Sequence, residues 1–197
     1  MIFLDFDNFR QSLFRTNSKR FYDFGKFSYF IIEFIRKSLQ VNCTKESLIR
    51  TYAYTGEYTE SIINKIKSED EKNKYLRRME AQQKFLRRVE RFNFFELTTL
   101  PLKYENGNIF QKGIDVRMAV DLVYHAFSNH FDSVVICSGD IDLVEAVKLV
   151  KRFGKKVIIM SHPTIASKEL IKQADYFINI AKLKEDELNL FSRIKND

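Results

Sequence analysis

The 197-residue sequence is poor in the residues that interrupt or link folded segments. It has two prolines, Pro101 and Pro163, and six glycines. No stretch rich in glycine, serine or proline marks a linker or a disordered arm. With a hydrophobic content of 45%, the chain can bury one sizeable core, and its length suits a single domain. We therefore expect residues 1–197 to form one compact domain.

Long apolar runs and closely spaced cysteines are also absent. The chain starts Met-Ile-Phe-Leu-Asp-Phe-Asp, which lacks the basic start and the apolar run of a signal peptide. No later stretch approaches the roughly 20 apolar residues of a membrane span. Cys43 and Cys137 lie far apart and do not have the spacing of a metal site. These features predict a cytoplasmic protein with two free thiols and no membrane partner.

The net charge of +7 is concentrated in one segment. Residues 72–91 contain two acidic side chains and eight basic ones, which are Lys72, Lys74, Arg77, Arg78, Lys84, Arg87, Arg88 and Arg91. Within this segment, Tyr-Leu-Arg-Arg-Met-Glu at 75–80 nearly repeats as Phe-Leu-Arg-Arg-Val-Glu at 85–90. At about 100° per residue, apolar side chains gather opposite a basic stripe, which consists of Arg77, Lys84, Arg88 and Arg91. Such a stripe is either a solvated face or a surface that binds nucleic acid.

Short β-branched and aliphatic runs alternate with segments of helical period, which is typical of a parallel sheet with covering helices. We expect strands near 1–6, 48–54, 93–99, 133–137, 156–160 and 176–180. Helices are expected near 26–40, 58–91, 114–130, 141–153 and 166–173, with a C-terminal helix at about 184–195. Asn106-Gly107 suggests a hairpin, and the aromatic-rich stretch 9–30 has no clear period. The fold class is thus α/β, with a central, mostly parallel sheet of five to six strands.

Acidic residues follow several of these strands. Asp5 and Asp7 end the first one, Asp140 and Asp142 follow the fourth, and Asp115 opens the helix at 114–130. Active sites of parallel sheets lie beyond the carboxyl ends of the strands, and converging carboxylates favour a hard cation. We therefore expect a site for Mg²⁺ or Mn²⁺, either of which can neutralise a phosphodiester and activate water.

Each acid also has a simpler explanation. Asp115 and Asp140 precede helices and would serve as N-caps, and Asp121 lies within a helix, where a salt bridge is as plausible as a site role. Asp7 adds a further carboxylate, but it ranks below Asp5 because it is expected to point away from it. It is the coincidence of acids at three separate segments that favours a shared site.

The order of these motifs resembles the NYN domain family, especially its LabA-like branch, a relative of the PIN nucleases. The resemblance rests on Asp5-x-x-Asn8 after an apolar strand, Lys-Gly-Ile-Asp-Val at 112–116, Ser-Gly-Asp-Ile-Asp at 138–142, Gly-Lys-Lys-Val at 154–157, and Ser167 and Leu170 before Ala-Asp-Tyr-Phe at 174–177. It covers about 1–8 and 110–180. The basic helical segment at about 57–92 matches no motif of the family and reads as an insertion.

This resemblance implies a three-layer, PIN-like Rossmannoid fold and metal-dependent endoribonuclease activity. Asp5, Asp115 and Asp140 would bind the metal, with Asp142 as a supporting group. Asn8 would orient the first carboxylate or a metal-bound water. Ser138 and Gly139 would let the backbone turn so that Asp140 faces the pocket. Phe6 stands where relatives often have glycine, which predicts a narrower groove.

Single-stranded RNA is the expected partner. Lys112 and the basic stripe would bind its phosphates. Two alternatives remain open. One is a PIN-like module that binds RNA or protein without turnover. The other is a haloacid-dehalogenase-like phosphatase, because Asp5-Phe6-Asp7 resembles its nucleophile motif. The sequence also leaves open a homodimer.

Overall fold

A computed structural model describes residues 1–40 and 42–195. Its centre is a six-stranded, entirely parallel sheet with the strand order β4-β3-β1-β7-β8-β9. The strands are β1 (Ile2–Asp5), β3 (Thr51–Glu57), β4 (Phe95–Pro101), β7 (Ser133–Cys137), β8 (Lys156–Ser161) and β9 (Tyr176–Asn179). The predicted fold class, an α/β protein with a central parallel sheet flanked by helices, is confirmed.

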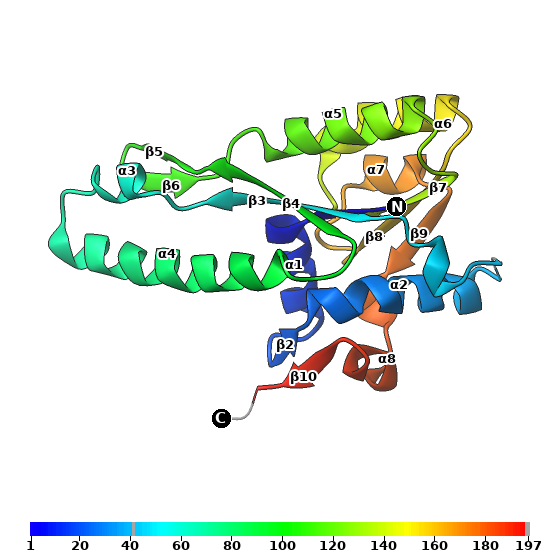
Figure 1. Cartoon of the computed structure of the whole chain (residues 1–197), viewed down its shortest axis with the longest axis horizontal. Coiled ribbons are helices and arrows are strands. Elements are labelled where there is room, and N and C mark those ends of the chain that lie inside the picture. Colours follow the sequence, from blue (N-terminus) through cyan, green and yellow to red (C-terminus); the bar gives the residue numbers. More distant parts are fainter. Residues whose placement is uncertain (41, 196–197) are drawn as a thin grey trace.

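Helices cover both faces of this sheet, which gives three layers (Figure 1). One face packs against α1 (Phe6–Thr16), α2 (Phe24–Ser38), the end of α4 (Glu69–Val89) and α8 (Glu185–Asn189). The other face packs against α5 (Ile114–Phe127), α6 (Val144–Arg152) and α7 (Lys168–Gln173). Successive residues of β1 serve the two cores, because Leu4 packs in the first and Phe3 in the second.

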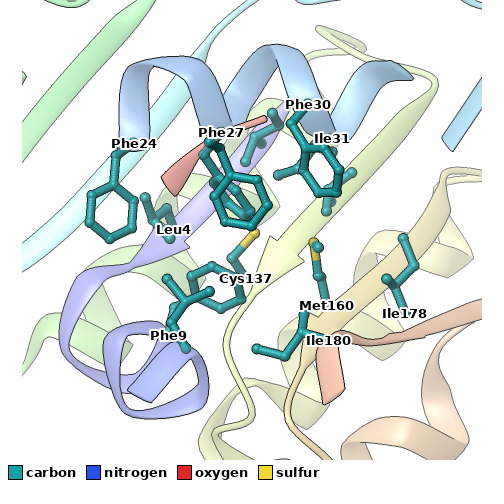
Figure 2. Close-up of a cluster of buried hydrophobic side chains, with 14 of the residues drawn as sticks. Leu4, Phe9, Phe24, Phe27, Phe30, Ile31, Cys137, Met160, Ile178 and Ile180 are labelled. Atoms are coloured by element: carbon teal, nitrogen blue, oxygen red, sulfur yellow. The ribbon is translucent and has the colours of Figure 1, made fainter. Parts of the chain in front are cut away.

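The aromatic-rich stretch that has no clear period forms two helices joined by a short strand, β2 (Arg20–Tyr22). Asp5 caps α1 and Asp23 caps α2, each accepting backbone N–H groups with its side chain. The inward faces of both helices supply phenylalanines such as Phe9 and Phe27, which meet Cys137 and Met160 on the sheet (Figure 2). The apolar positions of α1 and those of α2 do not follow one common helical repeat, because β2 separates the two helices. For that reason no single period runs through residues 9–30.

The single helix predicted at 58–91 is wrong in its first third. The chain forms a short helix, α3 (Glu60–Ile63), and α4 begins only at Glu69, after Ser68, whose hydroxyl accepts the N–H of Glu71. Ile63, Ile66 and Met79 bury one another in a small third core. That core extends to the hairpin of β5 (Lys103–Glu105) and β6 (Asn108–Phe110), which confirms the turn predicted at Asn106-Gly107. Together with α3 and α4, the hairpin projects beyond the main sheet (Figure 1).

The C-terminal helix predicted at 184–195 is also wrong beyond Asn189. After α8, the chain forms β10 (Ser192–Ile194), which pairs antiparallel with β2. Phe191 is fully buried against Phe27 and Phe30, and this burial overrides local helix propensity. The remaining elements are the 3₁₀ turns η1 (Lys45–Ser47), η2 (Ile141–Leu143) and η3 (Ile180–Lys182). None of the helices in the described part of the chain combines the length and apolar character needed to cross a membrane.

Candidate active site

The strand order creates a switch point between β1 and β7. After β1 the chain builds β3 and β4 on one side, and it returns to form β7 on the other side of β1. Connections on the two sides leave in opposite directions, and parallel sheets bind their ligands beyond the carboxyl ends of the strands at such a point. Asp5 ends β1 and the Ser138–Asp142 segment follows β7, which places both acidic segments at this switch point.

Asp5 is buried, and its side chain forms the N-cap of α1. Its Oδ1 accepts the backbone N–H groups of Asp7 and Asn8 at 3.1 and 3.0 Å. Hydrogen bonds of this kind favour the charged form, yet the pKa of Asp5 is raised from 3.8 to about 6. Burial is the largest cause, and the negative charges of Asp7 and Asp140 add to it. Asp5 and Asp140 therefore interact although they lie in distant parts of the chain.

Asn8 joins the two acidic segments. Its Oδ1 accepts the backbone N–H of Gly139 at 2.8 Å, while its own N–H binds Asp5. The side chain of Asn8 thus positions the loop after β7, whereas its backbone positions the first carboxylate. This differs from the predicted role, in which the Asn8 side chain itself orients that carboxylate or a water.

Ser138 and Gly139 allow the loop after β7 to pack closely. The buried Ser138 hydroxyl accepts the N–H of Asp140 at 3.2 Å. A Cβ on Gly139 would lie 2.5 Å from the Cα of Ala166, and the carbonyl of Gly139 accepts the N–H of Ser167 at 2.9 Å. Glycine is therefore required here for the approach of a neighbouring backbone.

Asp140 interacts with Asp142, which in turn interacts with Asp115. It caps η2, with its Oδ1 accepting the N–H of Asp142 at 3.0 Å. The pKa of Asp142 is raised, first by the charge of Asp140, then by partial loss of hydration, and then by the charge of Asp115 and a hydrogen bond to it. Asp115, at the start of α5, thus approaches the segment after β7. The structure brings together acids from all three predicted segments.

Two expectations about individual acids need correction. Asp115 is not an N-cap, because Gly113 occupies that position at φ 86° and Asp115 lies in the first turn. Asp7 is expected to point away from Asp5, but residues two apart on a strand share a face, and the strand in any case ends at Asp5. Asp7 belongs to the first turn of α1, and its charge acts on Asp5. The Asp7 Oδ2 accepts the hydroxyl of the buried Thr55 at 3.2 Å. Sequence reasoning missed Thr55, because only the pairing of β3 with β1 places it there.

Asp121 has a structural role. Its Oδ2 accepts the hydroxyl of the buried Tyr54 at 3.0 Å and the Nε of Arg117 at 2.9 Å. Both contacts lie within the α5 layer of the protein, and they account for this carboxylate without a part in the acidic site.

The acids interact pairwise, and they do not surround one common point where a metal ion would bind. Among residues 1–40 and 42–195, no group of three or more histidine, cysteine, aspartate or glutamate side chains is placed to hold one metal ion. Within the same residues, no salt bridge compensates the charges of Asp5, Asp115, Asp140 and Asp142. Uncompensated carboxylates at one edge, with raised pKa values for Asp5 and Asp142, are an oxygen donor set suited to a hard dication.

Each of the two principal carboxylates has an oxygen to spare. Asp5 and Asp140 both use Oδ1 for the cap, and the Oδ2 atoms have no hydrogen-bond partner in the described chain. Only the Nε of Arg20 is both enclosed and without a partner among the described residues. Oδ2 of the largely buried Asp5 is therefore not fully enclosed.

Phe6, the first residue of α1, contacts the basic helix α4. Its ring is buried and contacts Phe85 of α4 at 5.2 Å and Phe24 of α2 at 4.8 Å between centroids. Phe6 lies between Asp5 and Asp7 in the sequence, so α4 packs against the first turn of the helix that Asp5 caps. Phe6 thus lies in the contact between α1, α2 and α4, and the predicted narrowing of a groove by this side chain stays a prediction.

The predicted basic residues are all exposed: Arg77, Lys84 and Arg88 on α4, Arg91 in the turn that follows it, and Lys112 in the loop before α5. No salt bridge engages any of them within the described residues. Lys112 precedes the turn of α5 that carries Asp115, while the stripe runs along the helix that contacts Phe6.

Comparisons with known proteins agree with this architecture. The sequence matches the NYN domain over residues 1–181. It is 31% identical over 90 residues to the uncharacterized protein MJ0482 of Methanocaldococcus jannaschii; the match covers 42% of this chain and 38% of that relative's length. The crystal structure of VPA0982, a protein of unknown function from Vibrio parahaemolyticus, has a TM-score of 0.58 and 23% identity, over 98% of this chain and 94% of that one. At this identity the likeness shows the fold alone.

Proposed function

Because the chain belongs to the NYN domain family, a branch of the PIN-like nuclease superfamily, we propose that it is a metal-dependent ribonuclease that cleaves single-stranded RNA. The observation that carries this proposal is the meeting of acids from three segments at the switch point of the sheet. There, Asp5 is desolvated, and the charge of Asp140 acts on both Asp5 and Asp142.

The acids would hold the metal through the oxygens that the caps leave free. Asp5, Asp115 and Asp140 are the proposed ligands, and Asp142 supports Asp115 and Asp140. When bound, Mg²⁺ or Mn²⁺ supplies charge neutralisation at the phosphodiester and a water of lowered pKa. Asn8 keeps the two principal segments in register by holding Gly139 at 2.8 Å. Lys112 and the stripe of Arg77, Lys84, Arg88 and Arg91 would bind the phosphates on either side of the cleaved bond.

Cleavage of a labelled single-stranded RNA in Mg²⁺ or Mn²⁺ tests the proposal. Asp140→Asn keeps the capping oxygen but removes the charge, and we expect cleavage to fall at least about 100-fold, as when a principal electrostatic group is removed from an active site. Asp186→Asn, an exposed acid on α8, is the matched control and should cleave like the wild type. If Asp140→Asn retains cleavage within about twofold, which is less than about 0.5 kcal/mol of barrier, the acidic edge is not the active site.

A second candidate function is RNA binding without turnover. It is favoured by one observation: in the described chain, no three potential ligands are arranged to hold a metal together. The same experiment separates the two functions. RNA that is retained by the protein but stays intact in both metals, with Asp140→Asn indistinguishable from the wild type, supports the binding function and rejects the nuclease.

A further inference from the structure

The C-terminal end of α4 borders a hollow of about 490 Å³. Four cations and one aromatic ring line it: Lys84, Arg87, Arg88, Arg91 and Phe92. All four cations are exposed, and no salt bridge within residues 1–40 and 42–195 neutralises them. Two of the lining residues, Arg87 and Phe92, are outside the stripe that the helical wheel singles out. The hollow is thus a concave site with a strong positive charge and one flat apolar wall.

The aromatic wall is held in place by its surroundings. The Phe92 ring is half-buried and contacts Phe95 edge-on at 5.3 Å between centroids. It also lies against Gly25 at the start of α2, where a Cβ would come within 2.9 Å of the ring. The position of the ring is therefore fixed before any ligand binds, and a ligand that stacks on it loses little entropy to ordering the protein.

A second aromatic side chain marks the same turn. Phe94 is 50% exposed and has a φ of 62°, in the left-handed region that bulky residues rarely adopt. Its carbonyl accepts the N–H of Thr51 at 2.7 Å, so the turn is anchored to β3 while the ring faces solvent. The segment that closes the hollow thus presents aromatic surface next to the cations of α4.

We propose that this hollow binds one unpaired nucleotide of RNA, with the base against Phe92 and the adjoining phosphates on Lys84, Arg87, Arg88 and Arg91. The proposal rests on the ribonuclease function proposed above and names where its substrate is held. Cations alone would bind any polyanion. A ring beside them selects a strand whose bases are free to stack, because duplex bases are already stacked on each other.

The hollow lies at the end of α4 that adjoins the amino ends of the parallel strands. Its aromatic wall, Phe92, contacts Phe95 at the start of β4, and the carbonyl of Phe94 accepts the N–H of Thr51 at the start of β3. The acids follow the carboxyl ends of β1 and β7, and α4 approaches them through the contact of Phe85 with Phe6. A strand of RNA held in the hollow would therefore have to extend along α4 to reach the acids, so the captured base would not be adjacent to the cleaved bond.

The test measures RNA binding by fluorescence anisotropy in EDTA, so that no cleavage occurs. The probes are a fluorescent single-stranded oligouridylate and a blunt duplex of the same length. Phe92→Leu keeps the apolar contact with Gly25 and Phe95 but removes the stacking surface. We expect it to bind the single strand about tenfold more weakly, which is within the range of one lost base–aromatic stack. Its salt dependence and its affinity for the duplex should stay unchanged.

A pair of charge variants isolates the cations. Arg87→Gln with Arg91→Gln removes two charges from the hollow, and Lys74→Gln with Arg78→Gln removes two exposed charges from the same helix outside it. The first pair should lower the slope of log affinity against log salt by about 1.4, which is about 0.7 for each phosphate contact on a single strand. The second pair should change the slope by less than half as much. All four substitutions are at exposed positions, so folding is not at issue, and thermal unfolding checks Phe92→Leu.

Three results would overturn the proposal. These are unchanged single-strand affinity in Phe92→Leu, an equal loss for single strand and duplex, or an equal effect of the two charge pairs. Binding to phosphatidylserine vesicles without binding to the oligouridylate would also reject it in favour of a membrane surface. The two proposals fail separately. Cleavage that persists without any effect of Phe92→Leu on binding rejects the hollow alone, and a Phe92-dependent affinity without cleavage rejects the nuclease alone.

Discussion

The acidic edge and the basic helix α4 differ in construction as well as in charge. At the edge, distant segments are joined by single hydrogen bonds, such as that between Asn8 and Gly139, and each carboxylate is fixed by backbone N–H groups. On α4, the cations belong to one continuous helix and no salt bridge holds them within the described chain. Single substitutions should therefore have large, cooperative effects at the edge and small, additive effects on the helix.

Gly139→Ala should produce the largest effect on stability. Its Cβ would meet backbone atoms of Ala166 at 2.5 and 2.7 Å, and backbone cannot move aside as a flexible side chain can. We expect a loss of about 3 kcal/mol in the free energy of unfolding, measured by urea denaturation, together with loss of cleavage. Gly107→Asn is the control: this glycine has φ 80° and open space around it, and asparagine tolerates that conformation. Equal losses in the two variants would contradict the close approach at Gly139.

Asp5→Asn should stabilise the metal-free protein at neutral pH. The pKa of Asp5 is raised to about 6, so the folded protein binds a proton more tightly than the unfolded chain. The free energy of unfolding should therefore fall as the pH rises from about 4 to about 6. Asparagine keeps the cap without the charge. We expect the variant to be about 2 kcal/mol more stable than the wild type at pH 7 in EDTA, measured by urea denaturation.

The pH dependence and the response to metal complete this test. Asp5→Asn should show a flatter stability profile between pH 4 and pH 6. Mg²⁺ or Mn²⁺ should stabilise the wild type by more than the variant. A wild type whose stability rises through this pH range in EDTA would show that Asp5 is not desolvated as the structure indicates.

Asn8→Ala should have an intermediate effect. It removes the acceptor of the buried Gly139 N–H, which costs roughly 1–2 kcal/mol of unfolding free energy. Cleavage should fall more than stability does, because the two acidic segments lose their direct connection. Asn17→Ala removes a comparable bond to Lys19 at an exposed site and should cost less than about 0.5 kcal/mol. Similar results for both variants in urea denaturation and RNA cleavage would show that Asn8 does not position the site.

Arg77→Gln should have the smallest effect. This side chain is exposed and without a salt bridge in the described chain, so the free energy of unfolding should change by less than about 0.5 kcal/mol. If RNA runs along the stripe, the salt dependence of binding should fall by about one phosphate contact, roughly 0.7 in slope. Binding titrations with RNA at several salt concentrations measure this slope. An unchanged slope would indicate that RNA contacts the hollow at the end of α4 and does not extend along the stripe to Arg77.

Much of the fold could be predicted because its signals are local. Each strand of the main sheet lies within about three residues of its predicted position, since apolar runs and their flanking residues mark buried strands. The failures lie where distant contacts decide. Phe191 enters the core and Ser192–Ile194 pairs with Arg20–Tyr22, so the predicted final helix ends at Asn189.

Some features of the candidate site could also be predicted from local signals, and others depend on distant contacts. Acids after strands can be found in the sequence, because the ends of buried strands are marked there, and the motif order led to the family that the comparison confirms. The contact of Thr55 with Asp7 and the packing of α4 on Phe6 could not be found in this way. Each depends on where a strand ends or on which elements lie side by side.

The sequence by itself determined the α/β class, the acids and the basic helix, because these follow from residue types and their spacing over short distances. Only the tertiary structure decided that β1 and β7 are neighbours, that three acidic segments meet beside them, and that the hollow at the end of α4 lies near the amino ends of β3 and β4. Strand order and helix docking result from the burial of apolar surface between residues far apart in the chain. The local periodicity of a segment does not indicate which distant segment it packs against.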